Sequence, residues 1–210
     1  MQKLKKMEKA GLITKFELYI GRSKYGYRLT KLGAQKLQKY NEDLTIDFNN
    51  LCGVISNRKA AHNIAVQIVL ISRIVDAIKT GRTLKYATEK ELSTHRDMKD
   101  FKRPDLLIST GETVVAYEVE LTAKSQTEID QALLRNQNFL ESGKVSSIAY
   151  MISNQNFQTR YQNAMNNEEG VPLYEYNAKQ KKAKQTGEYF KFQYKNKLSF
   201  KYVPELKDFM

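Results

Sequence analysis

Apolar residues recur at helical spacing between residues 60 and 79, and this pattern predicts the principal core helix of the chain. The positions that set the spacing are Ile64, Ile68, Ile71 and Val75. Further along, two runs rich in β-branched residues flank Gly111 and predict a hairpin of strands at 106–109 and 113–121. The apolar pattern therefore changes from helical to strand periodicity near the middle of the chain.

The second strand of this hairpin has two unlike faces, because side chains alternate across a strand. Its apolar face consists of Val115, Tyr117, Val119 and Leu121. Glu118 and Glu120 share the other face and Asp105 precedes the first strand, so the hairpin brings three carboxylates to one rim of the sheet. Such a rim is costly unless a cation or a basic partner neutralises it. A metal site and a solvated acidic edge are both open readings of this spacing.

Capping and apolar signals predict the remaining elements of this region. Thr88 and Glu91 form a capping-box pattern at the start of a short helix. Gly143 stops a second helix, and an apolar run follows it. From residue 60 onward we expect a helix at 60–79, a strand at 83–87, a helix at 88–92, the hairpin, a helix at 127–142, a strand at 145–152, a helix at 157–166 and a strand at 171–176. This order indicates an α/β (α+β) fold.

The 210-residue chain carries a net charge of +12, which is concentrated at its two ends. Residues 1–40 hold 11 Lys or Arg against 2 acidic residues, a net of +9, and residues 178–210 hold 9 against 3, a net of +6. The intervening residues 41–177 carry a net of −3. Basic ends around a slightly acidic middle predict a polyanionic partner, with DNA ahead of an anionic membrane.

These changes in charge and pattern divide the chain into four segments. We expect a DNA-binding segment at 1–40, a polar linker at 41–57, a globular domain at 58–177 and a basic aromatic tail at 178–210. The tail alternates Lys with Tyr and Phe. This alternation suits single-stranded nucleic acid, and it equally suits a terminal hairpin packed on the core.

The first segment has the order helix, strand, basic turn, strand, helix. The predicted elements are a helix at 2–10 ended by Gly11, strands at 12–20 and 27–29, and a helix at 31–40 capped by Thr30. With the motif Ala10-Gly11-Leu12-Ile13, this order resembles the back half of a winged helix-turn-helix domain. The resemblance implies DNA contacts by Lys3, Lys5, Lys6, Lys9, Arg22 and Lys24.

The alternative reading of this segment is a basic β-hairpin appendage of the main domain. A winged domain normally has further helices ahead of the recognition helix, and this chain shows none. We expect one of two explanations for this winged-helix-like remnant. Either the N-terminus is truncated, or another subunit covers the apolar side chains that the missing helices would cover.

Pro104-Asp105, Glu118-Val119-Glu120 and Lys124-Ser125 resemble the metal-site motif of the PD-(D/E)xK nuclease superfamily. More narrowly, they resemble its branch among the replication-relaxation, or MobC-type plasmid mobilisation, proteins. The resemblance implies a restriction-endonuclease-like αβββαβ core, with Asp105 and Glu118 as Mg²⁺ ligands. It also implies a catalytic lysine that helps to activate water. Glu120 occupies the usual position of this lysine, and Lys124 is the candidate replacement.

The sequence lacks the residues required for several other kinds of site. Cys52 is the single cysteine, so an internal disulfide is excluded. No Gly-rich phosphate loop, zinc-type Cys/His spacing or serine-hydrolase elbow is present in the sequence. No apolar run approaches the roughly 20 residues that span a bilayer, and no signal peptide is evident. We therefore expect a cytoplasmic protein without a membrane partner.

Two functions remain open. The first is a non-catalytic DNA-binding accessory factor near a plasmid or conjugative-element origin, with a relaxase or replication protein and a second copy of the chain as further partners. The second is an active endonuclease, for which Mg²⁺ would be the cofactor. The basic ends and the replacement of the usual lysine by Glu120 favour the first function.

Overall fold

The structure is a computed structural model of the 210-residue chain. It describes residues 2–20, 23–40, 57–93, 103–177 and 182–209. The chain divides into two compact units, residues 1–63 with 208–210 and residues 64–207. The predicted linker at 41–57 lies almost wholly outside the described residues, since α3 (Asn57–Lys79) begins at its end.

The N-terminal unit has the helix, strand, strand, helix order that the sequence predicts. Its elements are α1 (Gln2–Lys9), β1 (Ile13–Ile20), β2 (Ser23–Leu29) and α2 (Lys31–Tyr40). The antiparallel ribbon pairs Ile13 with Leu29 and Phe16 with Gly26. A Cβ at Gly26 would lie 2.5 Å from the Phe16 ring, so a larger residue there would require that ring to move.

Thr30 joins this ribbon to α2 and fixes the turn that follows α1. Its Oγ1 accepts the amide N–H of Gly33 at 3.0 Å, which is the predicted helix cap, and donates to the carbonyl of Gly11 at 2.6 Å. Gly11 has a φ of +67°, the left-handed conformation that ends a helix. A Cβ at Gly33 would lie 1.9 Å from the carbonyl oxygen of Leu12. Glycine at position 33 therefore permits the close approach of α2 to the turn.

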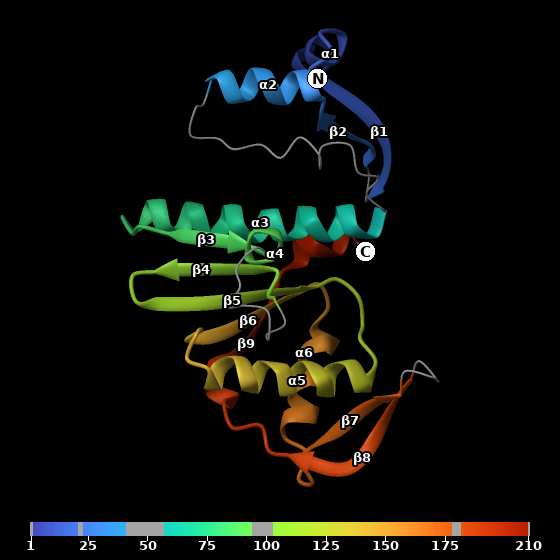
Figure 1. The fold of residues 1–210 in the computed structure, drawn as a ribbon, viewed down its shortest axis with the longest axis vertical. Coiled ribbons are helices and arrows are strands. Elements are labelled where there is room, and N and C mark those ends of the chain that lie inside the picture. The colour runs from blue at the N-terminus through green and yellow to red at the C-terminus, as the bar shows by residue number, and fades with distance from the viewer. Residues whose placement is uncertain (1, 21–22, 41–56, 94–102, 178–181, 210) are drawn as a thin grey trace. The chain divides into compact units, whose positions relative to one another are not determined.

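A five-stranded mixed sheet forms the centre of the second unit (Figure 1). Its strands, in spatial order, are β3 (Lys85–Thr88), β4 (Leu106–Thr110), β5 (Thr113–Glu120), β6 (Ser147–Ile152) and β9 (Leu198–Tyr202). β3, β4 and β5 are antiparallel neighbours, whereas β5, β6 and β9 run parallel. Gly111 has a φ of +65° in the turn between β4 and β5, and the predicted hairpin is confirmed.

The helices of this unit follow the strands in the predicted order. α4 (Glu89–Leu92) follows β3, α5 (Gln126–Glu141) links β5 to β6, and α6 (Gln155–Met165) follows β6. The predicted capping box is formed, since the amide of Thr88 donates to Oε2 of Glu91 at 2.7 Å. The chain is therefore a mixed α/β protein with a mixed central sheet.

Helices cover both faces of the sheet (Figure 1). α5 and α6 cover one face, and the main core lies beneath them. α3 lies on the other face, where the Arg73 guanidinium is 5.6 Å from the centre of the Tyr117 ring. Burial of apolar side chains between these layers is the main favourable term for folding. The most deeply buried core residues under α5 and α6 include Ile129, Leu133, Ile148, Tyr150, Ile152 and Tyr161.

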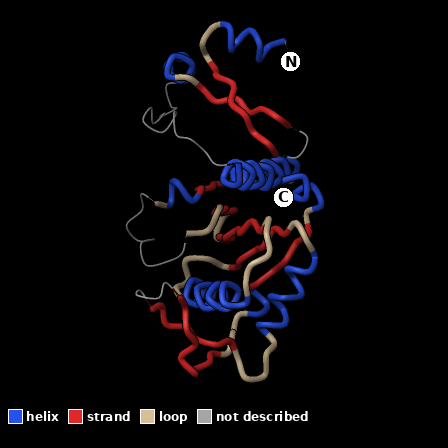
Figure 2. The backbone as a smooth tube through the Cα atoms, turned by 90° about the vertical axis from the view of Figure 1, so that its right-hand side faces the viewer, coloured by secondary structure: helices blue, strands red, loops and turns tan. Residues whose placement is uncertain are grey.

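The C-terminal tail packs on the core in two separate pieces. β8 (Lys182–Phe190) pairs with β7 (Val171–Asn177), and this ribbon lies beside α5 (Figure 2), where the Tyr174 hydroxyl donates to Asp130 at 2.9 Å. β9 then joins the central sheet, and Phe200 stacks on Tyr150 with ring centroids 5.2 Å apart. The tail thus contributes a strand to the main sheet, which the sequence analysis did not predict.

By length and composition alone, Lys59–Lys79 within α3 is long and apolar enough to cross a bilayer. The expectation that no apolar run reaches this length is therefore wrong for this helix. In the described structure α3 packs on the sheet, and its Arg73 and Asp76 form an ion pair at 3.3 Å. Core helices of soluble proteins meet the same criterion of length and composition.

Candidate functional site

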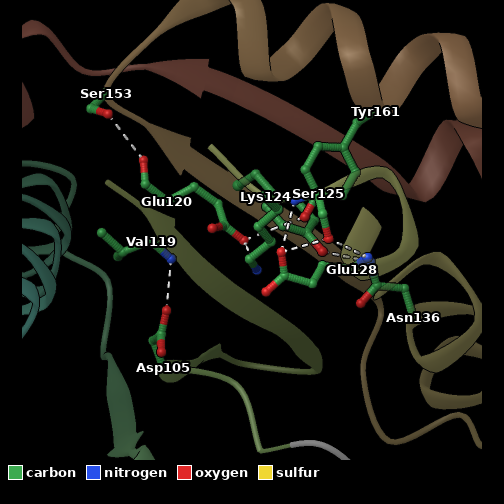
Figure 3. Close-up of polar contacts among 10 residues, drawn as sticks. Asp105, Val119, Glu120, Lys124, Ser125, Glu128, Asn136, Ser153 and Tyr161 are labelled. Atoms are coloured by element: carbon green, nitrogen blue, oxygen red, sulfur yellow. Dashed lines mark hydrogen bonds and ion pairs between the residues drawn. The ribbon is translucent and has the colours of Figure 1, made fainter. Parts of the chain in front are cut away.

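Asp105 precedes β4 at the corner where the predicted hairpin begins (Figure 3). Pro104 before it is fully buried, and the carbonyl of Asp105 accepts the amide N–H of Glu89 at 3.2 Å. Oδ2 of Asp105 accepts the amide N–H of Val119 at 2.7 Å. The Asp105 carboxylate therefore joins this corner to β5, at the residue between the two predicted glutamates.

The register of β4 and β5 puts the three predicted carboxylates on one face of the sheet. Leu107 pairs with Ala116 in this register. By alternation, Asp105, Glu118 and Glu120 lie on the same face as that pair, which α5 and α6 cover. Glu118 and Glu120 are each only 6% exposed. Burial disfavours an ionised carboxylate, so each glutamate needs a polar or cationic partner to stay charged.

Lys124 is the ionic partner of Glu120. Its ammonium group forms an ion pair with Oε1 of Glu120, and the hydroxyl of Tyr161 on α6 donates to the same oxygen at 3.4 Å. The Glu120 side chain is 8% exposed and that of Lys124 is 26% exposed, so the pair is largely withdrawn from water. Lys124, the candidate catalytic lysine of the sequence analysis, is thus bound to Glu120.

A series of buried polar groups extends from this ion pair into the core (Figure 3). The ring centroids of Tyr161 and Tyr150 are 4.8 Å apart, and Nδ2 of Asn136 donates to the Tyr150 hydroxyl at 2.7 Å. Burial raises the pKa of both phenols above the ordinary value, so both stay protonated at physiological pH. A neutral donor therefore holds Glu120 from the core side, and Lys124 holds it from the solvent side.

Hydrogen bonds fix the end of β5 against the end of β6. The amide of Ser153 donates to the carbonyl of Glu120 at 3.1 Å. The Ser153 hydroxyl donates to the carbonyls of Glu120 and Leu121 at 3.2 and 3.1 Å. Because β5 and β6 are parallel, their carboxyl ends meet at this edge of the sheet. Ligands of open α/β sheets commonly bind at such an edge.

A small, partly open depression lies at this edge, with a cavity volume of about 10 Å³, which is room for about one water molecule. Sequence analysis identified two of its residues, and it missed Tyr161, which is 41 positions from Glu120 along the chain. The apolar spacing of α6 marks the helix, but it does not tell which strand end the helix will face. The residues that line the pocket are Glu120, Thr122, Lys124, Ile129, Phe157, Arg160 and Tyr161.

The carboxylates do not gather into a metal site in this arrangement. Within the described ranges, no group of three or more His, Cys, Asp or Glu side chains is placed to hold a metal ion. Oδ2 of Asp105 accepts a backbone N–H, and Lys124 neutralises Glu120. The predicted site residues therefore share one face of the sheet without converging on one centre.

The lysines predicted to contact DNA lie along α1 and are accessible. α1 has no buried residue, and its four lysines are exposed. Arg22 lies outside the described residues, as does the side chain of Lys24, so their role in the turn stays a prediction. The exposed lysines of α1 are Lys3, Lys5, Lys6 and Lys9.

Replacing Lys124 with methionine is expected to destabilise the second unit. The change removes the ionic partner of the buried Glu120 carboxylate and leaves it the hydrogen bond from the Tyr161 hydroxyl, and removal of one partner of a largely buried pair costs about 2–4 kcal/mol. The free energy of unfolding can be measured with urea and tyrosine fluorescence.

The double variant Glu120→Gln, Lys124→Met removes both charges and is expected to return to within about 1 kcal/mol of the wild type. Lys201→Met, at an exposed position of β9, is the matched control and should leave stability nearly unchanged. A single Lys124→Met variant as stable as this control would contradict a structural role for the pair.

Comparison with known proteins leaves the family of this chain open. No family model, no curated protein and no solved structure matches the chain. The replication-relaxation and PD-(D/E)xK assignments therefore stay proposals drawn from sequence motifs.

Proposed function

We propose that this chain is a DNA-binding accessory protein of plasmid or conjugative-element mobilisation or replication, built on a degenerate nuclease-like fold. The observation that carries the proposal is the exposed row of lysines on α1, in a unit with a net charge of +9 over residues 1–40. Lysines presented on a helix contact phosphates, and each contact releases counterions from DNA.

The arrangement of the N-terminal unit supports a winged mode of DNA contact. α1 precedes a twisted antiparallel ribbon, and the capping bonds of Thr30 fix the ribbon against α2. In this mode α1 acts as the recognition helix and the end of the ribbon acts as a wing on the DNA backbone. The second unit then serves as the surface that recruits a relaxase or a replication protein.

The contacts of the nuclease-like site favour a scaffold role over catalysis. Lys124 is bound to Glu120, and Oδ2 of Asp105 is used to bridge to β5. Both groups thus stabilise the end of β5 in this arrangement. In the proposed scaffold role, the Lys124–Glu120 ion pair stabilises the sheet, and Lys124 is not available to activate water.

Duplex binding over a range of salt concentrations tests the proposed function. Fluorescence anisotropy with a labelled duplex measures the association constant at each salt concentration. We expect the logarithm of this constant to fall linearly with the logarithm of salt concentration, with a slope of about −0.9 per phosphate contacted. Binding that is indifferent to salt, or no binding at low salt, would contradict the proposal. Anionic vesicles at the same ionic strength provide the comparison with a membrane partner.

An active endonuclease is the second candidate function, and one observation favours it. Glu118 and Glu120 are buried on the same face of the sheet that the Asp105 carboxylate approaches. Buried carboxylates in such number are unusual in a purely structural sheet and are common where a cation binds.

Supercoiled-plasmid nicking separates the two functions. For an accessory protein we expect the plasmid to stay intact in the presence of Mg²⁺ or Mn²⁺, under conditions where the chain binds it. Nicking by the wild type that both Asp105→Ala and Glu118→Ala abolish would establish the endonuclease instead. Thermal unfolding of both variants would show that they are folded, because Asp105→Ala also removes the bond to Val119.

A further inference from the structure

The outer side of α3 is apolar, although it faces away from the sheet. Arg73 marks the inner side of this helix, because its guanidinium lies over the Tyr117 ring of β5. Each residue advances about 100° around an α-helix, so Ile71 and Val75 lie nearly opposite Arg73. Ile71 is 58% exposed, Val75 is 41% exposed and Ile78 is 73% exposed. The spacing that predicted a core helix therefore belongs in large part to an exposed stripe.

The inner side of α3 carries the smaller residues instead. Ala65 and Ala77 are buried there, together with Val66 and Val69. A surface helix of a soluble domain normally has polar residues on its outer side. Exposed β-branched residues do not favour the helix either, because their rotamers are restricted in it. Exposed apolar side chains that are clustered in this way mark a contact surface.

The outer residues repeat with the heptad spacing of a coiled-coil seam. Successive members are separated by four, three, four and three positions. This spacing keeps them in one line along the helix, and isoleucine and valine are typical of such seams. The members of this outer seam are Ile64, Ile68, Ile71, Val75 and Ile78. The same seam on a second copy has the matching shape, so the two can pair by two-fold symmetry.

The charge of the outer seam favours a second copy over a charged partner. None of the seam residues is charged, and the heptad positions that flank the seam carry one charge, that of Lys79. The chain has a net charge of +12, so two copies repel each other over most of their surfaces. The seam is where this repulsion is weakest, and it offers an acidic partner no row of cations. The flanking positions are Ala65, Gln67, Ser72, Ile74 and Lys79.

We propose that two copies of this chain associate through the outer seam, with their α3 helices packed in antiparallel orientation. In the register that fits the heptads, Ile71 packs against Val75 of the partner subunit. Lys79 then lies at the level of the uncharged Gln67 of the partner subunit, whereas a parallel pair brings the two copies of Lys79 to one level. Antiparallel helices also place opposite ends of their dipoles side by side. The inference goes beyond the proposed function and does not rest on it, since its evidence comes from α3 alone.

The first test measures the mass of the full chain by sedimentation equilibrium over a wide range of protein concentration. We expect the mass to rise from the chain mass of 24.3 kDa towards twice that value. The double variant Ile71→Gln, Ile78→Gln should weaken the dimer more than about tenfold, because both subunits lose buried apolar area. Glutamine is a good helix former, so thermal unfolding of this variant should show a folded chain.

The double variant Tyr176→Gln, Tyr189→Gln is the matched control for the first test. It removes two exposed apolar side chains from the β7–β8 ribbon and should leave the dimer unchanged. A wild-type mass of one chain at every concentration would overturn the proposal. Equal dimer affinity in the α3 variant and in this control would also overturn it, because the outer seam would then not be the interface.

The second test uses cysteines in the seam to measure the orientation of the two helices. The variants Ile71→Cys and Val75→Cys are made in a Cys52→Ser background, so that each chain holds one cysteine. Under air oxidation, an equal mixture of the two variants should form disulfide-linked dimers more readily than either variant alone. The reason is that position 71 lies opposite position 75 in the antiparallel pair. Faster cross-linking of each variant alone than of the mixture would overturn the antiparallel arrangement.

Vesicles of uncharged phosphatidylcholine test the alternative that the seam contacts a lipid surface, since α3 is long and apolar enough for a bilayer. We expect no vesicle binding by the wild type. A chain that is monomeric in solution and binds these vesicles, but loses this binding in Ile71→Gln, Ile78→Gln, would overturn the dimer and assign the seam to lipid. Dimers without any duplex binding would overturn only the proposed function. Duplex binding by a chain that stays monomeric at every concentration would overturn only the dimer.

Discussion

Duplex affinity is expected to fall about 10²–10³-fold at physiological salt when Lys3, Lys5, Lys6 and Lys9 are replaced together by glutamine, if each contacts one phosphate. All four lysines lie on α1, which has no buried residue, so the change removes charge without disturbing a core. The salt slope should become smaller by about 3.6, which corresponds to four phosphate contacts. Anisotropy titrations between low and physiological salt measure both quantities on one labelled duplex.

A variant with the same loss of charge elsewhere is the control for this result. The second unit offers four exposed lysines on separate elements for the matched set of glutamine replacements. If the control lowers duplex affinity as much as the α1 variant, net charge alone explains the binding and α1 is not the contact surface. The control positions are Lys85, Lys90, Lys191 and Lys201.

Gly33→Ala is expected to unfold the N-terminal unit, with a loss of about 3 kcal/mol or more. The added Cβ would lie 1.9 Å from the carbonyl oxygen of Leu12, which is rigid backbone rather than a flexible side chain. That carbonyl also accepts the amide of Thr30 at 3.0 Å, so moving it breaks the joint between the ribbon and α2. Amide hydrogen exchange of the ribbon residues measures the opening of this unit.

Gly81→Ala is the control for Gly33→Ala. Gly81 has a φ of +64° but nothing within 4 Å of the added Cβ, so only backbone strain of about 1 kcal/mol is expected. Duplex affinity should fall with Gly33→Ala and stay unchanged with Gly81→Ala, since α1 is presented by the N-terminal unit. Equal protection of the ribbon amides in wild type and Gly33→Ala would show that the turn tolerates the methyl group.

Local signals in the sequence were sufficient to predict most of the elements. The capping box of Thr88 and Glu91, the glycine turn at Gly111 and the cap by Thr30 each depend on residues within a few positions, and the structure contains all three. A capping box at Ser125 and Glu128 is also present. The residues of this capping box are visible in the sequence, but the prediction did not use them. The helix α5 therefore begins at Gln126, one residue before the predicted start at 127.

Long-range placement was not predictable from the same signals. Alternating aromatic and basic residues in the tail fit an exposed strand, a hairpin or a sheet strand equally well, because alternation does not name the partner of a strand. Strand alternation did predict that Glu118 and Glu120 share a face, and the hairpin predicted that Asp105 comes to the same edge of the sheet. It gave no information on the contact of Tyr161 with Glu120, which depends on the packing of α6 against the sheet.

The place of β9 in the sheet has a consequence for the solubility of the folding chain. Before β9 docks, β6 is an edge strand with a row of unpaired N–H and C=O groups and the apolar sequence Ser147–Ile152. Such an edge is a template for pairing with another chain. Residues 150 and 200 must meet across a segment that includes α6 and the β7–β8 ribbon, and contacts between residues so far apart in the sequence form slowly. Aggregation during refolding should therefore depend on protein concentration and on how quickly β9 closes the edge.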